Sequence, residues 1–123
     1  MDKILIIGDG TSFLDDVEAL LRHRYIVVRA ASGKRGLELV ASERVSAVLL
    51  ELTLPDMNGM DVLKNIHADI DPHIPVIIFT DHPEVDTAVR AMNVGAYDFV
   101  TRDFNLNVLA AKLVKALERR NLE

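Results

Sequence analysis

Short apolar runs alternate with segments of helical periodicity along the whole chain. The apolar, strand-like runs lie at residues 3–8, 25–31, 45–52, 74–80 and 96–100. The segments with apolar residues three or four positions apart, as on one face of an amphipathic helix, lie at residues 11–24, 32–43, 60–70, 82–95 and 105–120. The pattern predicts five strands that alternate with five helices.

The first, third and fourth strand-like runs are almost wholly apolar. Strands that are buried on both faces have this character, and a parallel sheet with helices on both faces buries its strands in this way. The sequence therefore predicts an α/β domain at residues 1–120, with a doubly wound, five-stranded parallel sheet and five helices on both faces. Residues 121–123 are expected to be a tail or a cloning remnant.

Several residues mark the expected ends of the helices. Thr11 or Ser12 can cap the first helix and Ser32 the second, because their hydroxyls accept a hydrogen bond from a backbone N–H of the first turn. Pro83 near the first helical position and Gly95 at the end are typical boundaries for the fourth helix.

Composition and charge exclude several classes of function. The 123 residues carry a formal net charge of −5, so direct binding of nucleic acid is not expected. The chain has no cysteine, and its four histidines form no pair four residues apart, which argues against thiol chemistry and a histidine metal site. No apolar run approaches the roughly 20 residues of a membrane-spanning helix. No signal peptide precedes the first strand-like run, so we expect no membrane contact and a cytoplasmic location.

Polar side chains follow the expected strands at their carboxyl ends, where doubly wound folds place their sites. Asp9 follows the first strand, Glu51 the third, Thr80 and Asp81 the fourth, and Arg102 the fifth. Each residue alone fits a capping or surface role. Their convergence favours a functional site without naming its function. Among them, Glu51 most needs a partner, because a charge at the end of an apolar strand is costly unless it is partnered or hydrated.

Residues 3–119 resemble a response-regulator receiver domain of two-component signalling. The resemblance is carried by ILIIGDG on the first strand, ELTLPDMNGMDVL after the third, PVIIFT on the fourth and GAYDFVTRDF around the fifth. It implies a flavodoxin-like sheet with strand order 2-1-3-4-5. The segments TAVRAMNVGAYDFV and NVLAAKLVKALERR look most like receivers that precede σ54-dependent, NtrC-type activators. A linked output domain or another protein partner is therefore expected.

The resemblance also assigns expected roles to the strand-end residues. Typical receivers hold Mg²⁺ with two acids after the first strand, and Gly8 and Asp9 stand at these positions. They phosphorylate an aspartate at the end of the third strand, where this chain has Glu51. Thr80 keeps the phosphate-contacting hydroxyl, and Arg102 replaces a lysine that pairs with the phosphate.

Two further positions complete the comparison with typical receivers. Asp81 stands where a small residue leaves room for the phosphoryl group, and Phe99 corresponds to the aromatic switch on the fifth strand.

These departures predict that phosphorylation and Mg²⁺ binding are weakened or lost. Mg²⁺ requires near-ideal octahedral oxygen geometry, and only Asp9, Glu51 and Thr53 remain as ligand candidates. We therefore expect no metal cofactor. The extra methylene of Glu51 moves its carboxylate by about 1.5 Å, and a misplacement of about 1 Å can slow an in-line reaction about a hundredfold. Instead of a metal, we expect Arg102 to pair with Glu51, Asp9 or Asp81.

The resulting hypothesis is a phosphorylation-independent regulatory or protein-interaction module. Glu51 either mimics the phosphorylated residue, with Thr80 drawn in and Phe99 turned inward, or fills the pocket of an inert scaffold. One alternative is a receiver that is still phosphorylated with Mg²⁺. Another is a small ligand- or nucleotide-binding protein, because GDGTS could bring two glycines and a helix N-terminus to a phosphate. An enzyme is not expected, since the chain has no complete set of catalytic residues.

The resemblance further implies a possible surface for a homodimer, formed by the fourth helix, the fifth strand and the fifth helix. Arg90, Asp98 and Lys112 are candidates for contacts there. The leucines of the last helix are expected to pack in the core; these are Leu106, Leu109, Leu113 and Leu117.

Overall fold

A computed structural model describes residues 1–9, 12–80, 84–101 and 105–122. Five parallel strands form one sheet in the order β2-β1-β3-β4-β5, which confirms the expected topology. The strands are β1 (Lys3–Ile7), β2 (Ile26–Ala30), β3 (Ala47–Glu51), β4 (Val76–Thr80) and β5 (Asp98–Thr101).

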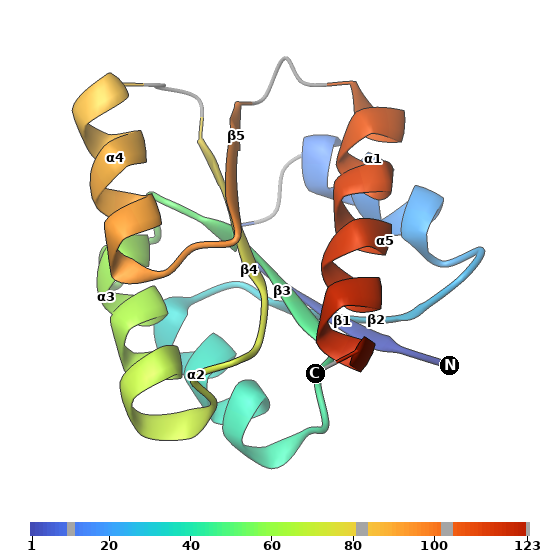
Figure 1. Ribbon diagram of the computed structural model, residues 1–123, viewed down its shortest axis with the longest axis horizontal. Helices are drawn as coiled ribbons and strands as arrows, with labels where there is room; N and C mark the ends of the chain where they lie inside the picture. Colours follow the sequence, from blue (N-terminus) through green and yellow to red (C-terminus); the bar gives the residue numbers. More distant parts are fainter. Residues whose placement is uncertain (10–11, 81–83, 102–104, 123) are drawn as a thin grey trace.

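Helices cover both faces of this sheet, as the alternating pattern predicts. Figure 1 shows α1 and α5 on one side of the sheet and α2, α3 and α4 on the other. The helices are α1 (Ser12–Leu21), α2 (Gly33–Ser42), α3 (Gly59–Asn65), α4 (Val85–Val94) and α5 (Leu106–Leu122). Residues 121 and 122 belong to α5, and the domain boundary expected at residue 120 stays a prediction.

The helix expected at residues 60–70 is present but changes type in its last part. A π-helix, η1 (Ile66–Ile70), follows α3, and the amide of Asp71 donates to the carbonyl of Ile66 at 2.8 Å. This bond spans five residues instead of four, so the chain makes a wider turn before β4.

The helix boundaries agree with the sequence at two positions. The hydroxyl of Ser32 accepts a hydrogen bond from the amide of Arg35 at 3.1 Å, and Gly95 ends α4 with a φ of 118°. Glu84 stands at the N-cap of α4, directly before the helix. Thr11 and Pro83 lie outside the described residues.

Two hydrophobic clusters fill the space between the sheet and the helices. Ile4 and Ile6 of β1 face the cluster under α1 and α5, whereas Leu5 and Ile7 face the cluster under α2, α3 and α4. This alternation follows from the opposite directions of successive side chains in a strand. The last helix buries its leucine face as expected, at Leu109, Leu113 and Leu117, with Leu106 partly buried.

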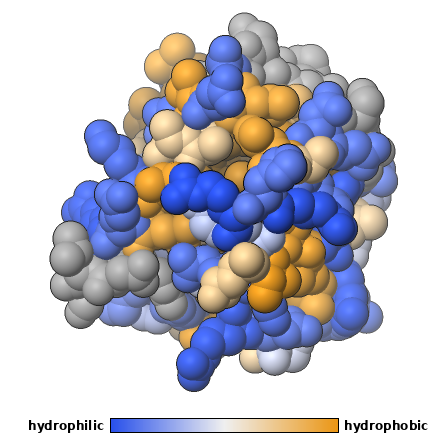
Figure 2. Space-filling view, turned by 90° about the vertical axis from the view of Figure 1, so that its right-hand side faces the viewer, coloured by the Kyte–Doolittle hydropathy of each residue, from blue (hydrophilic) through white to orange (hydrophobic). Residues whose placement is uncertain are grey.

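The outer surface on the α1 and α5 side is mainly hydrophilic, with smaller hydrophobic areas between the polar residues (Figure 2). Such a surface is expected where amphipathic helices turn their apolar sides to the sheet. Within the described ranges, no helix combines the length and the hydropathy that crossing a membrane requires.

The loop after β3 is held tightly against the end of that strand. The amide of Gly59 donates to the carbonyl of Leu52 at 2.7 Å, and Asn58 caps α3 by accepting a hydrogen bond from the amide of Met60 at 2.7 Å. A Cβ on Gly59 would lie 2.5 Å from the carbonyl oxygen of Glu51 and 2.9 Å from the Cα of Leu52. Position 59 therefore requires glycine for the backbone to pass this close to Glu51.

The same loop is also connected to the beginning of α2. The carboxylate of Asp56 accepts hydrogen bonds from the amides of Gly33 at 2.8 Å and Lys34 at 2.9 Å. These amides have no partner within the helix, and the helix dipole favours a negative charge at this end. The hydrogen bonds from Lys34 and Gly33 lower the pKa of Asp56.

We predict that Gly59→Ala lowers the free energy of unfolding by about 1–3 kcal/mol, because the added methyl group meets backbone atoms that cannot rotate away. Gly33→Ala is a matched control at the first residue of another helix, where the Cβ would meet the flexible side chain of Met57. Urea denaturation should show a smaller loss for this control. Equal losses would contradict the account of position 59.

We predict that the stabilising effect of Asp56 depends on pH. The pKa of Asp56 is lowered in the folded state, so the stabilisation is present above the unfolded pKa of about 3.9 and is lost as pH falls through the lower, folded pKa. The difference in urea midpoint between the wild type and Asp56→Ala should therefore shrink between neutral pH and pH values below about 4. A difference that stays constant over this range would exclude a role for the ionised carboxylate.

Candidate functional site at the strand ends

The register of the sheet brings the ends of its central strands to one edge. Ile7 pairs with Leu50, so Gly8 lies next to Glu51 at the following position. Glu51 pairs with Phe79, and Thr80 pairs with Thr101. The parallel topology thus brings the described strand-end residues of β1, β3, β4 and β5 to the edge where the sequence predicts a site.

A hydrogen bond joins the ends of β1 and β3 at this edge. The backbone N–H of Asp9 donates to Oε2 of Glu51 at 3.0 Å. Glu51 is half-buried, whereas Asp9 is exposed. The carboxylate therefore has a backbone donor at the point where it leaves the apolar interior, and this contact offsets part of the cost of removing its charge from water.

Gly8 leaves the space in which the Glu51 carboxylate lies. A Cβ on Gly8 would stand 2.7 Å from Oε2 of Glu51 and 2.7 Å from Cδ1 of Leu14, both far closer than ordinary contacts. The same Cβ would be 3.4 Å from the Cβ of Glu51. A side chain at position 8 therefore conflicts with Leu14 and, within Glu51, only with the outer part of the side chain.

Thr80 and Phe99 lie on the other side of β3 from Gly8. Thr80 ends β4 and is only 5% exposed. Phe99 on β5 is half-buried and packs against the cluster under α2, α3 and α4. Asp81 and Arg102 lie outside the described residues, and so does the ion-pair network expected for Arg102.

The described residues do not offer the acidic set with which typical receivers are expected to hold Mg²⁺. Gly8 contributes no carboxylate, and one oxygen of Glu51 is committed to the amide of Asp9. Thr53 is exposed and forms an isolated bridge with Asn58 in the loop. Within the part of the chain that the structure describes, no three acidic or histidine side chains are grouped to hold a metal ion. Weak or absent Mg²⁺ binding stays a prediction.

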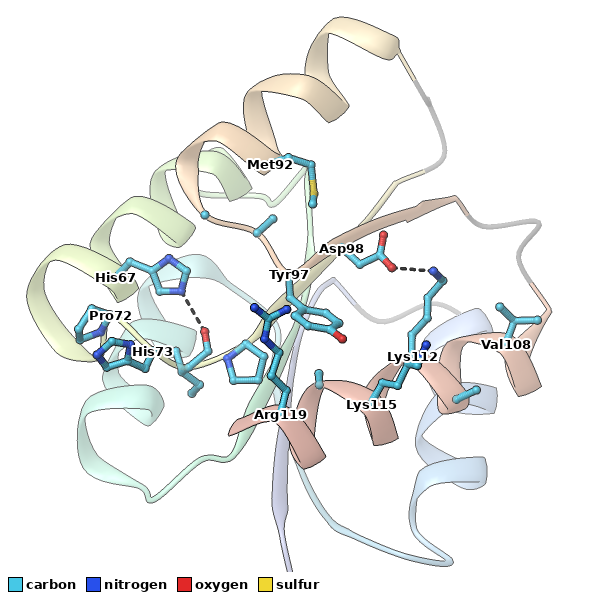
Figure 3. Close-up of a pocket in the computed structure, with 16 residues that line it drawn as sticks. His67, Pro72, His73, Met92, Tyr97, Asp98, Val108, Lys112, Lys115 and Arg119 are labelled. Atoms are coloured by element: carbon cyan, nitrogen blue, oxygen red, sulfur yellow. Dashed lines mark hydrogen bonds and ion pairs between the residues drawn. The ribbon is translucent and has the colours of Figure 1, made fainter. Parts of the chain in front are cut away.

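A groove of about 970 Å³ lies beside β5 and reaches the residues before β4. Figure 3 shows Met92 of α4, Tyr97 before β5, and Lys112 and Arg119 of α5 around it. Lys112 forms an ion pair with Asp98 of β5, with 2.6 Å between Nζ and Oδ2. Asp98 and Lys112, two of the residues expected to make contacts in a homodimer, thus pair with each other within one chain.

Exposed apolar side chains lie on the two helices that border the groove. They are Val85, Val89 and Met92 on α4 and Val108 on α5, each between 42% and 78% exposed. The apolar pattern of α4 does not identify these side chains as exposed, because the spacing of its three residues equally predicts a core-facing stripe. The spacing of these apolar residues is visible in the sequence, but it does not indicate which side of the helix faces the sheet.

Comparison with known proteins identifies the family. The model of the response regulator receiver domain matches residues 4–114. The transcriptional regulatory protein ZraR of Escherichia coli is 38% identical over 115 residues, which are 93% of this chain and 26% of ZraR. The response regulator protein PilR of Pseudomonas aeruginosa is 33% identical over 98% of this chain and 27% of its own length. The chain spans about a quarter of the length of these curated relatives.

Solved receiver domains have the same fold. A CheY-like receiver domain protein from Methanospirillum hungatei is 28% identical and superimposes with a TM-score of 0.92 over 98% of this chain and 97% of its own. A receiver domain protein from Clostridium thermocellum is 30% identical, with a TM-score of 0.91 over 99% and 98%. The family match, the sheet order and these relatives agree with the resemblance expected from the sequence. The chain belongs to the response regulator receiver domain family.

Proposed function

We propose that this receiver domain regulates its partner without phosphorylation of residue 51. The observation that carries the proposal is the hydrogen bond between the Asp9 amide and the Glu51 carboxylate, made over the glycine at position 8. A carboxylate that accepts a phosphoryl group needs an oxygen aligned with the donor and a cation to neutralise developing charge. Glu51 is longer than the usual aspartate, and Gly8 supplies no acid for such a cation.

The partner is proposed to be a linked output domain of a σ54-type transcriptional activator. The similarity to the transcriptional regulatory protein ZraR, whose full chain is about four times as long, supports this proposal. Membership of the receiver family supports signalling over the ligand-binding alternative. The module is proposed to act in the cytoplasm by protein contacts, without enzymatic activity and without a bound cofactor.

Two states of the domain are compatible with phosphorylation independence. The Asp9 contact draws one carboxylate oxygen of Glu51 towards β1. This contact favours an inert domain held in one state, with a retired pocket, that is, a pocket that no longer takes part in phosphorylation. Thr80 is buried at the end of β4, which favours the second candidate, mimicry of the phosphorylated state. Mimicry would be partial, because glutamate carries one negative charge and a phosphoryl group carries about 1.5 to 2.

The proposed surface for a homodimer is the face of α4, β5 and α5. The resemblance to receivers suggests this face, and the exposed apolar residues Val85, Val89, Met92 and Val108 support it. Exposed apolar side chains that lie close together are typical of interaction surfaces. The ion pair between Asp98 and Lys112 is proposed to order the edge of this surface within each chain.

We predict that the wild type gains no phosphoryl group when it is incubated with acetyl phosphate and Mg²⁺. The physical reason is the displaced carboxylate and the reduced acidic set. Intact-mass spectrometry measures the outcome, with a receiver that has an aspartate at the equivalent position as the positive control. A phosphoryl adduct that maps to Glu51 by fragmentation would refute the proposed function.

We predict that Val89→Asp weakens self-association, because it puts a charge into the apolar surface of α4. Ile26→Asp is the matched control: Ile26 is 46% exposed and Val89 is 53% exposed, but Ile26 lies on β2 at the opposite edge of the sheet. Sedimentation velocity over a concentration series should show dimer loss only for Val89→Asp. Equal behaviour of both variants would argue against this surface.

Glu51→Gln, measured in the same series, separates the two proposed states. It removes the charge and nearly keeps the shape of the side chain. Mimicry predicts that self-association weakens, whereas a retired pocket predicts no change.

A further inference from the structure

We propose that residues 8 and 51 form a compensating pair that keeps divalent cations out of the strand-end pocket. The Glu51 carboxylate takes the space of the side chain that is absent at position 8. A side chain can return to position 8 with less strain when residue 51 is shortened. This inference rests on the proposed function, because the contact uses the residue that a typical receiver would phosphorylate.

The geometry around Gly8 carries the argument. Two atoms obstruct a Cβ at this position, Oε2 of Glu51 and Cδ1 of Leu14, each at 2.7 Å. Leu14 is 1% exposed and belongs to the cluster under α1 and α5, so its movement disturbs a packed core. A Cβ therefore requires both atoms to shift, and the shift costs less at Oε2, which is the end of a flexible side chain. Moving it breaks the hydrogen bond from the Asp9 amide.

Charge adds to this steric conflict. An aspartate at position 8 would bring a second carboxylate within a few ångströms of the Glu51 carboxylate. Two like charges at this distance repel each other, and partial burial strengthens the repulsion. The conflict therefore has a volume component, which any side chain at position 8 produces, and a charge component, which only an acid produces.

Shortening residue 51 relieves the part of the volume component that is due to Glu51, whereas the contact with Cδ1 of Leu14 remains. The distance of 3.4 Å between the Cβ of Glu51 and an added Cβ at position 8 is an ordinary contact. The spacing of β1 and β3 therefore does not itself prevent side chains at both positions. An aspartate at position 51 withdraws the carboxylate by about 1.5 Å. Together with Asp9, two aspartates at positions 8 and 51 would form a group of three carboxylates, the kind of oxygen ligands that Mg²⁺ uses.

The test is a double-mutant cycle of Gly8→Asp and Glu51→Asp, with the melting temperature measured in EDTA and in MgCl₂. Gly8→Asp alone should lower the melting temperature by roughly 5–10 °C in EDTA. The double variant should lose less than the sum of the two single variants, which is the signature of a coupled pair. MgCl₂ should raise the melting temperature of the double variant, because Mg²⁺ binds preferentially to its folded state. It should not raise the melting temperature of the wild type or of Gly8→Asp.

Two control variants separate volume from charge. Gly8→Ala adds the Cβ without a charge, should destabilise less than Gly8→Asp, and should be partly rescued by Glu51→Asp, because the contact with Leu14 remains. Gly8→Asp with Glu51→Gln keeps the wild-type net charge but retains a long side chain at position 51, and it should stay destabilised in EDTA. If Gly8→Asp does not fold, the cycle of Gly8→Ala with Glu51→Asp makes the same test.

Additive losses in these cycles would overturn the inference, and so would a Gly8→Ala variant as stable as the wild type. An Mg²⁺ response shared by the wild type, or absent from the double variant, would overturn it as well. Failure of the proposed function is a separate result. Phosphorylation of wild-type Glu51 refutes the proposed function, whereas additive cycles in a protein that is not phosphorylated refute only the pair.

Discussion

The hydrogen bond from the Asp9 amide to the Glu51 carboxylate is the interaction on which this account of the strand-end edge depends. It joins the ends of β1 and β3, the two strands whose pairing of Ile7 with Leu50 brings residues 8 and 51 together. The bond forms because Gly8 has no side chain in the way. It gives a donor to a carboxylate that ends an almost wholly buried strand, and so makes the charge tolerable there.

Core packing and the loop after β3 hold this contact in place. Buried aliphatic residues on both faces of β1 and β3 fix the register of the two strands. After Glu51 the chain turns against its own backbone at Gly59, and Asp56 in the same loop is bound to the first amides of α2. The backbone of Glu51 is thus placed by core packing and by hydrogen bonds within the chain.

The fold could be predicted from the sequence because its signals are local and repeated. The apolar runs, the cap at Ser32 and the left-handed glycine at Gly95 each determine structure within a few residues. The π-helical turn after α3 and the exposed apolar side of α4 could not be predicted, since both depend on how one element packs against others. Gly8 was identified only as a missing acid. That its empty space contains the Glu51 carboxylate follows from the register between β1 and β3, two strands that are separated along the chain by α1, β2 and α2.

A receiver with this arrangement has the architecture of its family. In its pocket, the Glu51 carboxylate takes the space that a side chain at position 8 would fill. The most direct measurement is a crystal structure of the wild type grown with Mg²⁺ and beryllium fluoride, which imitates a phosphoryl group on a carboxylate. The account predicts Glu51 on the Asp9 amide, with neither cation nor fluoride bound in the pocket. A Mg²⁺ ion coordinated by Asp9 and Glu51, with beryllium fluoride attached to Glu51, would contradict it.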